Sequence, residues 1–142
     1  MNDNLCHELT HVAYSLVEDA AHLMHYIGPN ALLAKMGIKQ AYRLIPICPQ
    51  DCIFQGIQWR GLIYIDCQLP FDLALAPTIV SKLSEVLEWV LRKRRVRAVI
   101  HYMDDFLFMG ASSTSECSQA LAVNISSTIH TLVATSYGGL AR

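Results

Sequence analysis

Two segments of the chain carry apolar residues at helical spacing. Residues 76–94 predict the longer helix, with Pro77 in the first turn, where a backbone nitrogen needs no helical partner. Basic side chains at 92–95 close this segment and suit the helix dipole. Residues 10–27 show the same period and precede a Gly-Pro-Asn stop at 28–30, which predicts a second helix. The expected apolar face of the longer helix consists of Ile79, Leu83, Val86, Leu87, Val90 and Leu91.

Shorter apolar runs predict strands between these helices. Residues 31–35 form a short entry into a strand, and residues 41–47 continue as a strand or a short helix before Pro49. Residues 51–57 and 60–67 are expected to pair as two strands, because the link between them includes a glycine suited to a hairpin turn. The middle of the chain therefore predicts sheet.

A second hairpin is expected after the long helix. Residues 96–101 and 106–109 are short apolar runs on either side of Tyr102-Met103-Asp104-Asp105, and a glycine ends the second run. Residues 115–134 then predict a last, weakly amphipathic helix. Helices combined with a mostly antiparallel sheet indicate the α+β class, in one domain of 142 residues.

Composition, cysteine count and net charge narrow the class of protein and the cellular compartment that the sequence predicts. Hydrophobic residues make up 53% of it, but no run approaches the ~18 unbroken apolar residues of a membrane helix. No export signal precedes the first helix, and the odd count of five cysteines indicates reduced thiols in the cytoplasm or nucleus. No second cysteine pair completes a metal site with Cys48 and Cys52, so ordinary thiols are expected there. The net charge of −1 gives no general attraction to nucleic acid.

Asp104 and Asp105 stand side by side at the tip of the second expected hairpin. Strands disfavour aspartate and two like charges repel, so the pair needs a physical reason. A divalent cation supplies one, since Mg²⁺ is held by one or two carboxylates together with substrate phosphates. The alternative is an ordinary turn, in which aspartate is common. The full tetrapeptide between two apolar strands favours a metal-binding hairpin.

Four motifs in order resemble the palm of retroelement reverse transcriptases. Besides the tetrapeptide at 102–105, the resemblance is carried by residues 32–44 (LLAKMGIKQAYRL), 58–64 (QWRGLIY) and 69–77 (LPFDLALAP). The DIRS-like elements are the most similar type, and the gypsy type comes next. The resemblance spans about residues 10–125.

The resemblance implies one partial reverse transcriptase domain over residues 1–142, built as a palm-like antiparallel sheet with packed helices. Within it, residues 1–30 would be a remnant of the fingers, 31–115 the palm motifs, and 116–142 a palm helix and divergent tail. The expected fold therefore has incomplete fingers and no thumb, as in a truncated element copy.

The resemblance also implies an activity and the residues that carry it. The activity is RNA-directed DNA synthesis by a two-metal mechanism, with an RNA or DNA template-primer and deoxynucleoside triphosphates as partners and no membrane. Asp104 and Asp105 would be catalytic and would bind two Mg²⁺ ions, in a metal site that includes Ile38. Tyr42 would lie under the sugar of the incoming nucleotide, and Phe71 would line the same pocket. Core packing is the alternative for both aromatic rings.

Two positions depart from the family pattern. The first palm motif of the family has Asp where this chain has Gly37, and glycine has no side chain to bridge two metal ions. The motif before the long helix has Gly where this chain has Asp72, whose charge would oppose the incoming triphosphate. Losing the bridging carboxylate is expected to lower the rate about a thousandfold. Two hypotheses follow: an impaired polymerase, or an inactive relic that acts at most as a weak binder of nucleic acid or protein.

A basic cluster at 92–95 and Arg97 offers a further candidate surface. Its side chains could contact the phosphates of a template-primer. The alternative is a solvated helix end, which the helix dipole favours. The second interpretation is the stronger of the two.

Overall fold

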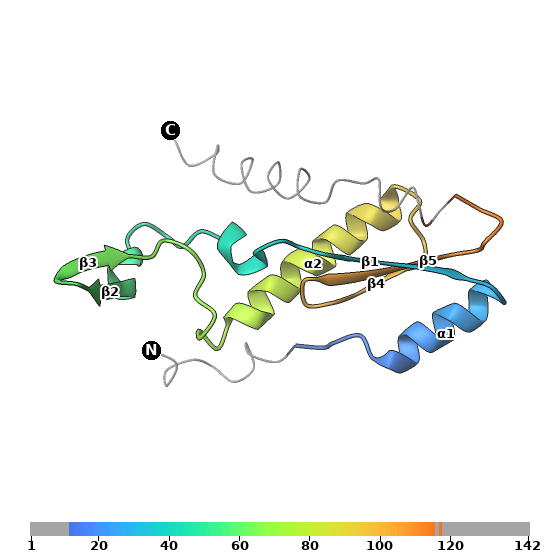
Figure 1. Cartoon of the computed structure of the whole chain (residues 1–142), viewed down its shortest axis with the longest axis horizontal. Helices are drawn as coiled ribbons and strands as arrows, with labels where there is room; N and C mark the ends of the chain where they lie inside the picture. The colour runs from blue at the N-terminus through green and yellow to red at the C-terminus, as the bar shows by residue number, and fades with distance from the viewer. Residues whose placement is uncertain (1–11, 116, 118–142) are drawn as a thin grey trace.

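The computed structural model describes residues 12–115 and 117, which form an α+β fold (Figure 1). This part of the chain contains the helices α1 (Val17–Ile27) and α2 (Ala76–Lys93), and the strands β1 (Leu32–Gly37), β2 (Gly56–Trp59), β3 (Leu62–Ile65), β4 (Val99–Tyr102) and β5 (Asp105–Gly110). Two short 3₁₀ helices, η3 (Ala41–Leu44) and η4 (Cys52–Gln55), lie between β1 and β2. The expected α+β class is confirmed. Neither α1 nor α2 is long and apolar enough to cross a membrane.

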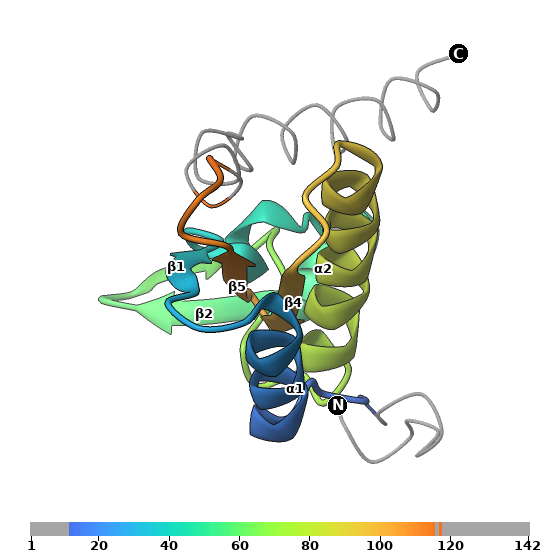
Figure 2. The ribbon, with the colours of Figure 1, turned by 90° about the vertical axis from the view of Figure 1, so that its right-hand side faces the viewer.

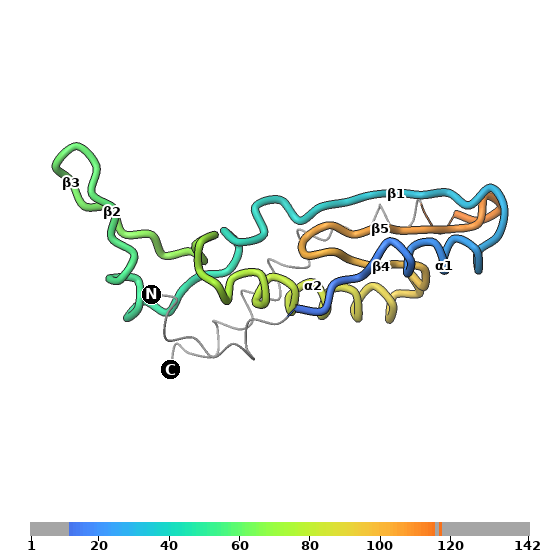
Figure 3. Tube along the Cα trace, turned by 90° about the horizontal axis from the view of Figure 1, so that it is seen from below, coloured from blue at the N-terminus to red at the C-terminus, as the bar shows by residue number. Residues whose placement is uncertain are grey.

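Strands β1, β5 and β4 form an antiparallel sheet with β5 in the centre (Figure 3). The register pairs Asp105 with Gly37 on one neighbouring strand and with Tyr102 on the other. Directly opposed residues of antiparallel strands point to the same face of a sheet. The sheet therefore places Gly37, Asp105 and Tyr102 in one row on one face.

Helix α2 covers the opposite face of this sheet and closes the core (Figure 2). Leu87 and Leu91 are buried there with the rings of Phe106 and Phe108, which alternate along β5 toward the same side. The expected helix is confirmed, but its buried face is rotated from the predicted one. Val86 is 48% exposed, and the small side chain of Ser84 is fully buried in its place. An apolar pattern gives no signal for a buried serine.

Strands β2 and β3 form a separate two-stranded hairpin that projects from the rest of the molecule (Figures 1 and 3). Its turn consists of Arg60 and Gly61, whose φ angles are 50° and 76°. Two left-handed residues match the twist of hairpin strands, so the predicted glycine turn is confirmed. The base of the hairpin is tied by a bond from the Asp66 N–H to the Gln55 oxygen, at 3.2 Å.

Several predicted element bounds are wrong, each because of a local bond. The helix expected from residue 10 begins at Val17, since the Asp19 carboxylate accepts the Leu16 N–H at 2.7 Å and caps the first turn there. The first part of the strand expected over 51–57 is η4, where the Phe54 N–H donates to the Asp51 oxygen.

Three further predictions concern the start of the second hairpin, the segment after β1 and the last helix. The strand expected from residue 96 begins at Val99, because the Val96 N–H still bonds the Leu91 oxygen at the end of α2. Residues 41–47, expected as a strand or a short helix, contain η3. The helix expected over 115–134 lies outside the described residues apart from Ser115 and Cys117.

Candidate functional site

The two aspartates lie at the turn between β4 and β5. Tyr102 and Asp105 pair across the hairpin, so Met103 and Asp104 form its two-residue turn, with a φ of 52° at Met103. The main-chain oxygen of Asp104 accepts a hydrogen bond from the Ile38 N–H at 2.8 Å. This bond ties the turn to the residue that follows β1. Ile38 itself is buried, so its contact with the carboxylate turn is through the backbone.

Gly37 lies opposite Asp105 in the sheet. A Cβ added at Gly37 would lie 2.9 Å from Asp105 Oδ1, so a side chain at this position would point at the carboxylate. Lys35, two residues earlier on the same strand face, places its Nζ 2.9 Å from Asp105 Oδ2. A lysine therefore neutralises the carboxylate that faces Gly37. Both side chains are well exposed, so the pair contributes little to stability.

The two aromatic residues expected at a nucleotide pocket do lie together. The rings of Tyr42 and Phe71 have centroids 4.5 Å apart and are tilted by 41°. Tyr42 comes from η3 and is partly buried, whereas Phe71 is 70% exposed. Burial raises the pKa of Tyr42, and the negative charge of Asp104 raises it further. Tyr42 thus contacts Phe71 and lies within electrostatic range of Asp104.

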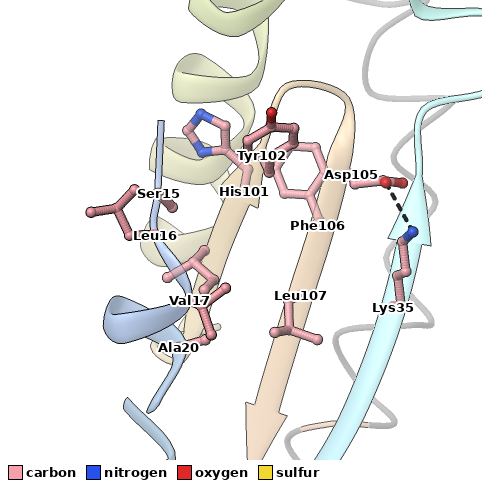
Figure 4. A pocket seen from close by; sticks show the side chains of 11 residues that line it. Ser15, Leu16, Val17, Ala20, Lys35, His101, Tyr102, Asp105, Phe106 and Leu107 are labelled. Carbon is pink, nitrogen blue, oxygen red and sulfur yellow. Dashed lines mark ion pairs between the residues drawn. The ribbon is translucent and has the colours of Figure 1, made fainter. Parts of the chain in front are cut away.

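A second aromatic pair includes Tyr102, the last residue of β4 before the turn. The ring centroids of Tyr14 and Tyr102 are 4.9 Å apart, with the planes tilted by 33°. Beside this pair is an apolar pocket of about 310 Å³ between the start of α1 and the sheet (Figure 4). Leu16 and Val17 line one side of it, and the Lys35–Asp105 ion pair is at its edge. Tyr102 is 54% exposed, so part of its ring is available to a partner.

A partly buried ionic network joins β4 to α2. Nδ1 of His101 lies 2.6 Å from Glu88 Oε2, and the Arg92 Nε donates to Glu88 Oε1 at 2.8 Å. The same guanidinium donates to the main-chain oxygen of Val99 at 2.9 Å. Only 12% of the His101 side chain and 18% of the Glu88 side chain are exposed. Because His101 precedes Tyr102, this network fixes the strand that leads into the turn.

The pKa of Glu88 is set by two opposing effects, which are burial and hydrogen bonding. Burial opposes the charged carboxylate and by itself would raise the pKa of Glu88. The hydrogen bonds from His101 and Arg92 favour the charged form and outweigh burial, so the pKa of Glu88 is below its ordinary value of 4.5. Glu88 is therefore a carboxylate at neutral pH.

The basic side chains fall into two groups: Arg92 and Lys93, which have partners on α2, and the three arginines that follow them. Arg92 belongs to the network with Glu88, and Lys93 lies over the ring of Trp89, with its Nζ 5.5 Å from the centroid. The remaining arginines at 94, 95 and 97 are exposed at the end of α2. Since α2 runs antiparallel to β4, these arginines lie at the opposite end of β4 from the turn at Asp104.

The ligands for a metal can be counted at the turn. Asp104 and Asp105 supply two adjacent carboxylates, and Gly37 supplies none. Among residues 12–115 and 117, no three side chains of His, Cys, Asp or Glu are grouped so that they could hold a metal ion. The donors at the turn do not fit a pair of bridged Mg²⁺ ions, because the bridging position has no side chain.

Sequence reasoning located some of these residues and missed others. The sequence predicted site roles for two aspartates and two aromatic residues, Asp104, Asp105, Tyr42 and Phe71. The two aspartates are adjacent at one turn, the two rings are in contact, and the Asp104 charge acts on Tyr42. Sequence reasoning missed the partners that hold them: Lys35, Tyr14 and the pairing of Glu88 with His101. A signal did exist for the lysine, because alternate residues of a strand share a face and Lys35 precedes Gly37 by two.

Comparison with known proteins assigns this chain to no family. None of the protein-family models scanned matches the chain. A search of curated proteins also finds no match. The case for a function therefore rests on the residues and their arrangement.

Proposed function

We propose that this chain is a reverse transcriptase palm whose capacity for nucleotidyl transfer is impaired. The observation that carries the proposal is the meeting of four motif residues from three separate segments. Asp104 and Asp105 stand at a hairpin turn, Tyr42 and Phe71 are in ring contact, and the Asp104 charge raises the pKa of Tyr42. This juxtaposition is what a nucleotide site next to catalytic carboxylates requires, and neighbours in sequence alone do not produce it.

The pairing of Gly37 with Asp105 supports the same assignment and explains the impairment. The family pattern expects an aspartate at this position, and an added Cβ would point at the Asp105 carboxylate. Three carboxylates would then converge, as a two-metal site needs. With glycine, Mg²⁺ lacks its bridging ligand, and Lys35 provides the positive charge beside Asp105 instead.

A second candidate function is binding without catalysis. The Lys35–Asp105 ion pair favours this function, because the lysine offsets part of the negative charge of the two aspartates at the turn. Exposed rings at Tyr102 and Phe71 could stack on the bases of a nucleic acid. In this case the chain would be a relic that binds nucleic acid weakly.

Primer extension discriminates between the two functions. The substrate is poly(rA) with an oligo(dT) primer, in the presence of Mg²⁺ or Mn²⁺. We expect extension by the natural sequence to be lower by about a thousandfold than extension by the double variant Gly37→Asp, Asp72→Gly. The control is Asp104→Asn added to the double variant, which should abolish the regained activity.

A parallel measurement keeps the two outcomes separate. Binding of the same duplex is followed by fluorescence anisotropy for the natural chain and for the double variant. Equal binding with extension only in the double variant supports the impaired polymerase. Equal binding with extension in neither variant supports the binding function, and loss of binding in both contradicts each proposal.

A further inference from the structure

Three cysteines converge at the base of the projecting hairpin. Cys48 and Cys52 precede β2, and Cys67 follows β3. Both hairpin strands therefore lie between Cys52 and Cys67 in the sequence. The Cys52 thiol donates to the main-chain oxygens of Cys48, at 3.5 Å, and of Ile47, at 4.0 Å. The Ile47 N–H in turn donates to the Cys67 oxygen at 3.0 Å. Ile47 thus joins the segment before the hairpin to the segment after it.

Among the neighbours of the Cys52 thiol, the Cys67 thiol has the largest effect on its pKa. A hydrogen bond between their side chains is the largest cause of the raised pKa of Cys52, and burial adds to it. Cys67 is exposed, whereas Cys52 is buried, with 6% of its surface accessible. An external reagent would therefore meet the exposed Cys67 before the buried Cys52, and both residues bond to the main chain of Ile47.

We propose that Cys52 and Cys67 are a redox-active dithiol, which low-molecular-weight disulfides oxidise to an intramolecular disulfide across the base of the hairpin. The Cys67 thiolate attacks one sulfur of the external disulfide, forms a mixed disulfide and releases one thiolate. Cys52 then loses its proton to water, attacks the Cys67 sulfur and expels the second external thiolate. The two cysteines lose two electrons and two protons in total, and the external disulfide is reduced to two thiols.

The Cys52–Cys67 disulfide would restrain the segment that is linked to the Tyr42–Phe71 ring pair. Asp66, next to Cys67, accepts a hydrogen bond from Arg43 and another from the Gln68 N–H at 3.0 Å. Arg43 follows Tyr42 in η3, so the hairpin base and the Tyr42 turn are already linked by one ion pair. A disulfide between Cys52 and Cys67 would add a covalent restraint next to this ion pair. This chemistry does not depend on polymerase activity.

Thiol counting and peptide mapping test the proposal on the full chain, with oxidised glutathione as the probe. Trypsin cleaves after Arg43, Arg60 and Lys82, so Cys67 is released on a different peptide from Cys48 and Cys52. We expect the natural chain to lose two thiols and to yield a linked pair of these peptides that dithiothreitol separates. Cys48→Ser is the matched control and should give the same linked pair.

Single-cysteine variants establish the order of the two steps. Cys52→Ser should stop at a glutathione adduct on Cys67, and Cys67→Ser should form no linked peptides. In the oxidised natural chain, amide hydrogen exchange in β2 and β3 should slow by roughly a hundredfold, because the disulfide closes the loop that contains both strands. A linked pair that disappears in Cys48→Ser would overturn the proposal, and so would glutathione adducts that never close in the natural chain.

Discussion

The central sheet and the projecting hairpin are built from similar apolar strands, but only the sheet is covered. Phe106 and Phe108 of β5 are fully buried, whereas every residue of β2 and β3 is exposed, including Ile63 at 73% and Trp59 at 62%. The sheet has α2 across one face, whereas the main neighbour of the hairpin among the described residues is the short helix η4 just before β2. Burial therefore follows from what packs on a strand, and apolar composition alone does not determine it.

The two regions are also held by different contacts. The sheet is stabilised by close-packed rings and by the network of Glu88 with His101. A two-stranded hairpin is marginal by itself in water, so this one depends on its base. The contacts there include the bridge between Pro46 and Gln68 and the ion pair of Arg43 with Asp66. The sheet should therefore govern global unfolding, and the hairpin should open locally.

The largest expected effect is the loss of a buried ring. Phe106→Ala should lower the free energy of unfolding by about 3–5 kcal/mol, because it leaves a cavity between the sheet and α2. Ile63→Ala in the hairpin is the matched control and should change it by less than about 0.5 kcal/mol. Urea unfolding followed by circular dichroism measures both. Similar losses for the two variants would show that the hairpin belongs to the same cooperative core.

This comparison also marks what the sequence could and could not predict. The periodic pattern of α2 and the glycine of the Arg60–Gly61 turn depend on neighbours in sequence, and both elements formed where they were expected. The pattern could not separate the buried strand β5 from the exposed strand β3, because both are apolar. That difference is decided by tertiary packing, which lies outside any local window.

The next largest effect concerns the ionic network between α2 and β4. Glu88→Gln should lower the free energy of unfolding by about 1–3 kcal/mol, because it removes a charged partner from both His101 and Arg92. Glu85→Gln on the same helix is the control, since Glu85 pairs only with Lys82 at the surface, and its effect should stay below about 0.5 kcal/mol. Equal effects in chemical denaturation would mean that the network adds nothing to a surface pair.

The pH dependence of stability should carry the signature of Glu88. Its pKa in the folded chain is below the ordinary 4.5, so the unfolded chain takes up the proton first as the pH falls. The contribution of Glu88 is fully present above about pH 4.5 and is lost as the pH falls through the folded pKa. The stability difference between the natural chain and Glu88→Gln should shrink in that range. A difference that stays constant from neutral pH to below the folded pKa would contradict this origin.

The same contrast holds for the candidate site: the local sequence predicted some of its residues, and tertiary packing determines the others. Asp104 and Asp105 were visible as a motif, because adjacent carboxylates between apolar strands are unusual. Their neighbours Lys35 and Tyr14 come from other segments and reach the turn only through the β1–β5 register and the packing of residues before α1. Sequence patterns predict which residues carry charge, and the fold decides which charges meet.

The smallest expected effect is confined to the hairpin turn. Gly61 has a φ of 76°, and an added Cβ would meet no atom within 4 Å, so Gly61→Ala strains only the backbone, by about 1 kcal/mol. Gly56 has a φ of −75°, and its added Cβ would make an ordinary contact with Ile63 at 3.7 Å, so Gly56→Ala is the control. Amide exchange in β2 and β3 should quicken in Gly61→Ala alone, while the urea midpoint of the whole chain stays unchanged. A lowered midpoint would mean that the hairpin unfolds together with the sheet, and the contrast between the two regions would then be one of exposure and not of stability.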